Sequence, residues 1–393
     1  MNLRRFLQFL LVSLLFLMES SEALYAQVPS EAQTNGSRFN SIRTAVPFLL
    51  ITPDARTGGM GEAGVAVAPD VNSLSINPSR IAFLEQRSGF SLSYSPWLKN
   101  IASDINLGYL SGFYKIDENS TIGSSLRYFS LGKIQLTDVN QQDLGTFSPS
   151  ELAVDVTYAH RFGDSFSLGT AVRYISSNIA TNQFSAGQDT RAGQAFAVDI
   201  SAYFKKQTYL LGHDAVLAAG MNISNIGTKM SYADAAEEYF LPGNLKIGGA
   251  GTFIIDEEND ITIALDFNKL LVPTQPLYNG DGTIQSGKDP NRSVPSGIFG
   301  SFSDAPGGAG EEIKEINIAS GLEYWYNKRF ALRAGYFYEN PRKGDRRYFT
   351  LGTGIRYNTM ELNFSYLLAN SQKSPLANTL RFSLMVNLGG NSQ

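Results

Sequence analysis

Three glycines near the start of the chain have the spacing of a loop that binds a dinucleotide. Gly59, Gly61 and Gly64 fit the pattern Gly-x-Gly-x-x-Gly, and an apolar run over 46–51 precedes them. Such a loop binds a pyrophosphate where it joins a strand to a helix in an alternating fold. No alternation of strands and helices follows these glycines, so a dinucleotide site is not expected. We predict instead that they let the backbone pack closely against a neighbouring wall.

His160 and His213 are the only histidines of the chain. The histidine base of a hydrolase must lie within hydrogen-bond reach of a nucleophile at the substrate. Both histidines lie next to predicted tight turns at one end of the fold, away from the end where a surface hydrolase would meet lipid or peptide. Surface histidines near turns explain this pattern. We therefore predict that the protein is not an enzyme.

No cofactor or metal ion is expected either. The acidic runs at 117–118 and 256–258 lack the ligand spacing of a calcium loop, and solvated turns explain them. The chain has no cysteine, which excludes disulfides, thiolate metal sites and a lipoprotein anchor. With a net charge of −4 and a pI of 5.4, it has no basic footprint for nucleic acid.

The N-terminus predicts secretion. Two arginines at 4–5 precede an apolar stretch over 6–18, and the polar segment after it ends in Ala26. A basic start, an apolar stretch too short to cross a bilayer and a small residue before the cut are typical of a signal peptide, here over 1–26.

The composition favours a membrane barrel. The chain is 43% apolar, 17% charged and 12% aromatic, with 37 glycines, which is unusual for a soluble secreted protein. No later segment offers the roughly 18 to 20 unbroken apolar residues of a membrane helix. If the chain lies in a membrane, a closed β-barrel is the remaining structure that satisfies its backbone there.

From residue 88 onward, segments of about ten residues alternate apolar and polar side chains and end at turn residues. The fourteen strands that we predict cover 89–96, 104–115, 120–131, 150–161, 166–176, 194–205, 213–223, 244–255, 259–269, 313–326, 330–339, 348–357, 360–368 and 379–388. Short polar turns alternate with long connections, which are 132–149, 177–193, 224–243 and 270–312. This alternation is typical of short periplasmic turns and long extracellular loops, and a soluble sandwich would not need it. We predict an all-β, transmembrane antiparallel barrel with both termini in the periplasm.

The two faces of these strands differ in chemistry. Outward positions carry apolar residues, and aromatic residues gather at strand ends as in membrane girdles. The aromatic residues at strand ends are Tyr94, Trp97, Phe113, Tyr114, 324–326 and 336–338. The charged residues at inward positions are Arg127, Asp155, Arg173, Asp199, Asp266, Glu323, Arg333, Arg356 and Arg381. We predict that these charges pair with one another and brace the barrel rather than line a conducting pore.

Residues 27–87 are expected to form an N-terminal plug or hatch segment, and 88–393 the barrel. The structural residues of this segment are Gly59, Gly61, Gly64, Asn77 and Pro78. Proline after Asn77 fixes a turn, and a short apolar turn or helix should follow it.

The same segment carries a longer motif, Pro-Asp-Ala-Arg-x-Gly-Gly-Met-Gly-Glu-Ala-Gly-Val-Ala from Pro53, followed by Asn77-Pro78-Ser79. This combination closely resembles the PorV family, also called LptO, of the type IX secretion system in Bacteroidota. The Asn-Pro-Ser step is also similar to the Asn-Pro-Ala turn of the wider FadL-like barrels, with Ser79 in place of alanine. The resemblance covers nearly the whole mature chain, and related barrels of the group share the motif.

The resemblance implies an integral protein of the cell outer membrane that works in secretion. It would bind the C-terminal signal domain of cargo and shuttle it from the translocon to the cell-surface attachment machinery. The implied partners are the translocon barrel, cargo signal domains, attachment components and outer-membrane lipid or lipopolysaccharide. The alternative is a FadL-type transporter of hydrophobic small molecules, which should show a continuous apolar cavity with a few polar groups.

Two of the long loops, 224–243 and 270–312, contain many apolar residues although loops in water should be polar. The candidates for partner contact are Ile298, Phe299, Phe302, Tyr239 and Phe240. Apolar side chains that stay exposed together mark binding surfaces. The other possibility is that the loops fold over the barrel mouth and bury these residues against one another. Gly297 and Gly300 are expected to let the tip of the second loop adapt to a partner.

Overall fold

The computed structural model describes residues 40–98, 102, 104–137, 140, 142–179, 191–232, 238–369 and 376–389. The predicted signal peptide, 1–26, lies outside these residues. The chain divides into two units, Met1–Phe39 and Asn40–Gln393, and the described residues all belong to the second.

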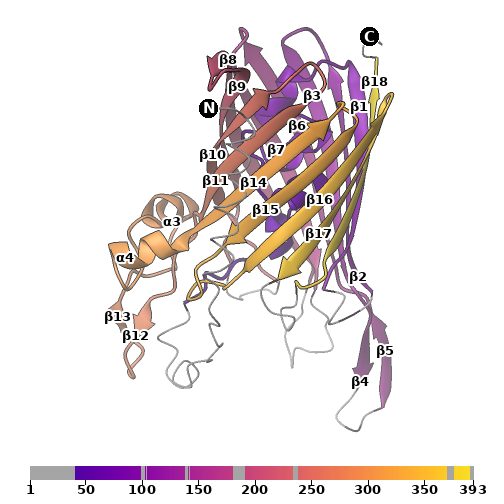
Figure 1. The fold of residues 1–393 in the computed structure, drawn as a ribbon. Helices are drawn as coiled ribbons and strands as arrows, with labels where there is room; N and C mark the ends of the chain where they lie inside the picture. Colours follow the sequence, from indigo (N-terminus) through magenta and orange to yellow (C-terminus); the bar gives the residue numbers. More distant parts are fainter. Residues whose placement is uncertain are drawn as a thin grey trace, which may run out of the picture. The chain divides into compact units, whose positions relative to one another are not determined.

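Fourteen antiparallel strands form one closed barrel (Figure 1). They are β1 (Ser88–Pro96), β2 (Ile105–Lys115), β3 (Ser120–Leu131), β6 (Ser150–Phe162), β7 (Phe166–Asn178), β8 (Gly193–Leu210), β9 (His213–Gly227), β10 (Asn244–Ile254), β11 (Asp260–Leu270), β14 (Ile316–Tyr326), β15 (Phe330–Tyr338), β16 (Arg347–Tyr357), β17 (Met360–Ala369) and β18 (Leu380–Leu388). The barrel closes where β1 pairs with β18, with Ser88 opposite Leu388. The predicted all-β fold class and the strand number are confirmed.

Short and long connections lie at opposite ends of the barrel, as Figure 1 shows. Tight turns join β2 to β3, β6 to β7, β10 to β11, β14 to β15 and β16 to β17. The strand predicted over 194–205 is too short, because β8 continues to Leu210. It reaches β9 through Leu211 and Gly212, which both have a positive φ. Because β1 begins and β18 ends at the tight-turn end, the first and last strands share that side.

The long connections contain structure of their own. Residues 132–149 hold the hairpin of β4 (Ile134–Thr137) and β5 (Asp143–Phe147). The connection from β11 to β14 contains β12 (Leu277–Tyr278), β13 (Ile284–Ser286), α3 (Val294–Gly300), α4 (Ala309–Glu312) and the 3₁₀ turn η5 (Ile313–Glu315). The predicted strand over 313–326 is therefore wrong in its first residues, because η5 occupies them and β14 begins at Ile316.

Side chains alternate between the two faces along most of the strands. In β6, Ala153, Asp155 and Thr157 are buried inside while Val156 is 64% exposed on the outer wall. The girdle prediction is wrong for Trp97, Trp325, Phe113 and Phe337, because all four side chains are buried inside the barrel. Guanidinium groups lie over the rings of the two tryptophans, that of Arg381 over Trp97 and that of Arg356 over Trp325.

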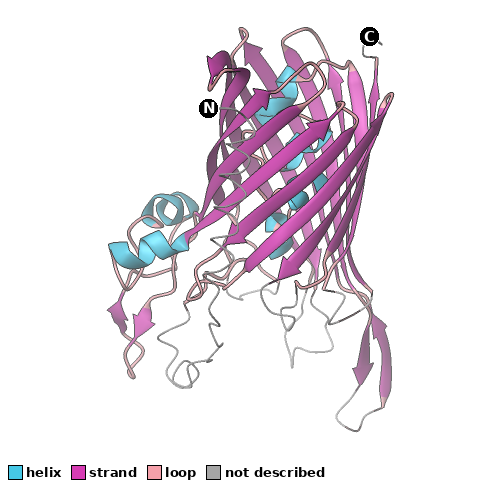
Figure 2. Ribbon diagram, viewed as in Figure 1, coloured by secondary structure: helices cyan, strands magenta, loops and turns pink. Residues whose placement is uncertain are grey.

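The segment before the first strand runs through the interior of the barrel (Figure 2). It forms η2 (Pro47–Leu50), α2 (Ala55–Gly59), η3 (Val71–Ser75) and η4 (Pro78–Phe83). The short helix α2 contacts β15 to β18, η3 contacts β1 to β3, and η4 contacts β3, β6, β7 and β8. We call residues 40–87 the lumenal segment. Among the described residues, no helix is long and apolar enough to cross a membrane.

Candidate functional site

The glycine motif of the lumenal segment lies directly against backbone of the barrel wall. Asp54 caps α2 by accepting the N–H of Thr57 at 2.8 Å, and the following glycines approach strands β14 to β16. A Cβ on Gly59 would stand 3.0 Å from the Cα of Gly352. At Gly61, whose φ is +65°, it would stand 2.4 Å from the backbone nitrogen of Tyr336. A side chain at either position would therefore collide with the wall.

Gly64 differs from the other two glycines of the motif. A Cβ there would meet Thr57 and Ile76, so its close contacts lie within the lumenal segment. Its backbone N–H still reaches the barrel by donating to the Asp266 carboxylate at 2.7 Å. The neighbouring N–H of Val65 donates to the same oxygen at 2.9 Å.

The turn at Asn77, Pro78 and Ser79 is fixed to the opposite wall. The side-chain amide of Asn77 donates to the carbonyl groups of Val65 at 2.8 Å and Ala202 at 3.1 Å. The Ser79 N–H donates to the Ser201 hydroxyl at 2.9 Å. Pro78 begins η4, as the sequence predicts, because proline needs no N–H partner in a first turn.

Buried charges tie the lumenal segment to the strands. Glu323 on β14 accepts hydrogen bonds from Arg56 of the lumenal segment at 2.9 and 2.7 Å and from Arg333 of β15 at 2.6 Å. A second cluster joins strands only, with Arg173 paired to Asp155 and, at 2.9 Å, to Asp199. The prediction of paired inner charges therefore holds for these two clusters.

Four of the predicted inner charges have partners that were not among the predicted inner charges. Arg127 donates to the backbone carbonyl groups of Phe48 and Leu49, at 3.3 and 2.7 Å, rather than to an acid. Arg381 pairs with Glu62 of the lumenal segment at 3.3 Å. Asp266 accepts the two backbone N–H groups described above. Arg356 pairs with Glu361 at 2.7 Å near the tight-turn end, where its side chain is 45% exposed.

The two histidines lie at the tight-turn end, near the turns that the sequence places beside them. His160 is near the end of β6, where its Nδ1 lies 3.1 Å from the Ser120 hydroxyl, and His213 begins β9. Within the described part of the chain, no cluster of acidic residues and histidines has the arrangement of a metal site.

A surface of apolar side chains stands at the end with the long connections. We call Phe299, Phe302 and Ile313 the loop surface; they are 79%, 50% and 70% exposed. Ile298 is half-buried and Tyr239 is 39% exposed. Apolar side chains that stay exposed together in one loop mark a candidate binding surface.

Other apolar residues of the same loops are buried instead. Met230, Leu241, Leu271 and Val272 are each at most 4% exposed, so the loops bury part of their apolar content against one another. Phe240 belongs to this packing, because a Cβ on Gly297 would stand 2.6 Å from its ring. The expectation that 294–302 forms an adaptable tip is wrong, since α3 occupies most of it and Gly297 permits close contact with Phe240.

An ionic cluster holds the loop surface to the barrel rim. Glu315 accepts from Lys269 at 2.6 Å and from Lys343 at 2.9 Å. Burial would raise the pKa of Glu312, but the N–H of Ala305 and the ammonium group of Lys269 outweigh burial and lower the pKa. The ion pairs of Glu312 and Glu315 with Lys269, and of Glu315 with Lys343, fix the base of the loop. Sequence patterns gave no sign of the cluster, because its members come from three separate connections and strands.

A sequence profile described as "Type IX secretion system protein PorV" matches residues 33–277 of the 393. The chain belongs to this family. The predicted resemblance to the PorV family is confirmed, and with the apolar outer wall of a closed barrel it places the chain in the outer membrane. A family of secretion barrels also agrees with the interpretation that the chain is not an enzyme.

Solved barrels are similar to this PorV-family chain at low identity. The toluene transporter TodX of Pseudomonas putida has 12% identity and a TM-score of 0.47, covering 84% of this chain and 95% of TodX. A FadL homologue of Pseudomonas aeruginosa has 10% identity and a TM-score of 0.44, covering 88% of this chain and 99% of the homologue. No curated protein sequence matches the chain.

Proposed function

We propose that this PorV-family barrel binds the C-terminal signal domain of secreted cargo and shuttles it from the translocon barrel to the cell-surface attachment machinery. Membership in a type IX secretion family supports a role in protein secretion. The loop surface, with Phe299 79% exposed on a loop held by buried ion pairs, is the observation that carries the binding role. A rigid apolar surface loses little conformational entropy when a folded partner covers it.

The alternative, a FadL-type transporter of hydrophobic small molecules, needs a continuous apolar path. Two cavities lie along the inner wall of β9 and β10. Between them Val65 packs closely against Gly220 and Gly248. The cavity nearer the long connections is lined mostly by polar residues, and buried ion pairs fill other parts of the lumen. These features favour binding at the outer surface over passage of an apolar molecule through the barrel.

Replacing both Phe299 and Phe302 by serine is expected to weaken partner binding at least about tenfold, because exposed aromatic anchors each contribute about 2 kcal/mol or more when a partner buries them. Recovery of cargo signal domain and translocon with the barrel, purified from detergent-solubilised membranes, measures the effect. Tyr357→Ser is the matched control, since Tyr357 is 73% exposed at the end of β16, beside a tight turn at the other end of the barrel. Undiminished recovery with the double variant, at normal barrel abundance, would remove the loop surface from the proposal.

We further propose that both termini are periplasmic and that the long connections face outward. An epitope tag inserted after Gly282, in the exposed turn between β12 and β13, should bind antibody on intact cells. A tag after Gln393 should bind only after the outer membrane is permeabilised. A C-terminal tag that is detected on intact cells would reverse the topology and move the loop surface to the periplasm.

A further inference from the structure

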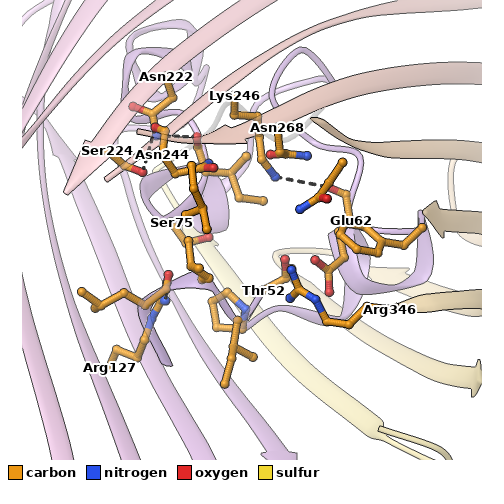
Figure 3. A pocket seen from close by; sticks show the side chains of 18 residues that line it. Thr52, Glu62, Ser75, Arg127, Asn222, Ser224, Asn244, Lys246, Asn268 and Arg346 are labelled. Atoms are coloured by element: carbon orange, nitrogen blue, oxygen red, sulfur yellow. Dashed lines mark hydrogen bonds between the residues drawn. The ribbon is translucent and has the colours of Figure 1, made fainter. Parts of the chain in front are cut away.

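The strands β8 and β9 leave one edge of the sheet open at the tight-turn end. Nearer the long connections, polar side chains of β9 to β11 and residues of the lumenal segment face each other across a cavity (Figure 3). At the other end, the pairing of β8 with β7 stops at Phe204. The last bond on that side joins the Lys205 N–H to the Ser165 carbonyl at 2.8 Å, yet β8 continues to Leu210. We call residues 206–213 the hairpin tip.

The free edge of the hairpin tip presents backbone groups that a further strand can bind. Direction alternates along a strand, so the N–H and C=O groups of Gln207 and Tyr209 point to the same side as the N–H of Lys205. No strand lies on that side, and these groups have no partner among the described residues. The opposite edge is paired with β9 as far as Leu210 and His213. An open edge of this kind is a template for an added strand.

The end of the hairpin tip is apolar although it lies beyond the rest of the sheet. Tyr209 is 69% exposed and Leu211 is 75% exposed. Leu211 also has a φ of +55°, a left-handed conformation that leucine disfavours and that asparagine or glycine adopts readily. In the other turns between strands at this end, the residues at positive φ are glycine or polar, namely Gly163, Asn327, Lys328 and Asn358. Neither the backbone nor contact with water explains a leucine here, and such a conflict marks a functional site.

The hairpin tip extends past the level of the lipid headgroups. The exposed aromatic pair Phe166 and Phe204 marks that level on the outer wall. From Phe204 to Leu210 an extended strand rises about 20 Å, or about 15 Å along the membrane normal at a tilt of about 40°. The headgroup layer is only about 5 to 8 Å thick. A protein, rather than lipid, is therefore the partner that covers the apolar tip.

A second copy of the barrel does not supply the missing strand. Two copies in one membrane have the same orientation, so a two-fold axis along the membrane normal leaves their tilted β8 strands crossing at about 80°. Paired strands differ in direction by only about 25°. The occupant is therefore an extended segment of another protein. Lys206 is exposed beside the free edge, which favours an acidic side chain in that segment.

We propose that the hairpin tip is a docking site for an extended segment of a periplasmic protein. The segment adds as a strand beside Gln207 and Tyr209, covers the side chains of Tyr209 and Leu211 and places a carboxylate near Lys206. Its location in the periplasm rests on the proposed topology, whereas the docking does not depend on the loop surface.

Cysteine labelling tests the docking, because the chain has no cysteine of its own. Leu210→Cys places a single thiol on the hairpin tip. Ile254→Cys is the matched control, since Leu210 and Ile254 are both 40% exposed and both end a strand at this side. In cells with a permeabilised outer membrane, N-ethylmaleimide should label Leu210→Cys at least about fivefold more slowly than in the purified barrel in lipid vesicles, because a partner at about four times its Kd covers about four-fifths of the tips. Ile254→Cys should be labelled at the same rate in both.

The other outcomes of the labelling would overturn the proposal. Equal rates for Leu210→Cys in cells and in vesicles would show that no partner covers the tip. Labelling that is already slow in vesicles, compared with detergent micelles, would assign the tip to the lipid surface. Labelling of intact cells by a maleimide that does not cross the outer membrane would reverse the topology and move the hairpin tip outside.

Variants in the Leu210→Cys barrel separate strand addition from side-chain contact. Gln207→Pro removes an N–H that the sheet does not use, so the barrel should fold normally while the slow labelling is lost. Gln207→Thr keeps the N–H and should stay protected. Leu211→Asn suits the left-handed turn, so it should leave the barrel at least as stable and yet abolish protection. Heat-modifiable gel mobility establishes folding, and a folded Gln207→Pro barrel that stays protected would overturn strand addition.

Discussion

Replacement of Glu323 by leucine is expected to destabilise the barrel by about 3 to 5 kcal/mol, because it leaves two buried guanidinium groups without their shared carboxylate. Glu323 is 1% exposed and accepts from Arg56 and Arg333 at 2.6 to 2.9 Å. Since Arg56 belongs to the lumenal segment and Arg333 to the wall, the change should also loosen the segment. Urea unfolding of the barrel in lipid vesicles measures the loss, and planar-bilayer recording detects openings that the unaltered barrel should lack.

Two further variants separate charge from packing at Glu323. Glu257→Leu changes an exposed residue in a tight turn and should leave stability within about 0.5 kcal/mol. The double variant Glu323→Leu with Arg333→Met should recover at least half of the loss, because Arg56 keeps its pair with Asp70 at 2.9 Å and the wall guanidinium that would lose its carboxylate is absent. If the double variant is as unstable as Glu323→Leu alone, lost packing rather than uncompensated charge explains the effect.

Gly61→Ala is expected to lower the free energy of unfolding by at least about 3 kcal/mol. The strain of a left-handed backbone and the overlap of the new Cβ with the barrel wall both contribute to this loss. The φ of Gly61 is +65°, and a Cβ would stand 2.4 Å from the nitrogen of Tyr336 and 2.7 Å from the carbonyl oxygen of Ser320. Both atoms belong to paired strands, so they cannot move aside without breaking the sheet. The temperature at which the barrel loses its compact gel mobility should fall, and the folded fraction in the membrane should decrease.

Gly163→Ala is the matched control for this prediction. Gly163 has a φ of +70° in the turn between β6 and β7, and a Cβ there would have no atom within 4 Å. Gly163→Ala should therefore lower the free energy of unfolding by only about 1 kcal/mol, which is the cost of the left-handed backbone for alanine. Equal losses at Gly61 and Gly163 would show that backbone conformation, and not contact with the wall, is the reason for glycine in the motif.

The strand pattern could be predicted because it is local. Alternation with period two depends only on neighbouring residues, and each strand of the barrel buries one face and exposes the other. The alternation over 152–158 therefore predicts both the strand β6 and the inward position of Asp155, as the structure has them. Turn residues such as those at 163–165 give the ends of strands for the same reason. The one strand predicted much too short, β8, continues through Lys205, Lys206 and Gln207, where charge and polarity interrupt the pattern.

The loop surface could be predicted only in part. Apolar residues in the long connections are visible in the sequence, but Phe240 is packed against α3 while Phe299 is 79% exposed. Which of them stays exposed depends on contacts between two connections and on the ion pairs of Glu315 with Lys269 and Lys343. Sequence spacing contains no information about those distances.

By itself, the sequence determined the number of strands, the side on which most strand residues lie and the family. Only the tertiary structure decided which partner each inner group has. Arg381 could have paired with any acid of the wall, yet it pairs with Glu62, 319 positions away in the chain. Likewise, the row of Asn222, Lys246 and Asn268 exists only because the register of β9, β10 and β11 brings these residues together. The physical reason is that the face of a strand is set by its own backbone, whereas pairing across the lumen is set by closure of the barrel around its N-terminal segment.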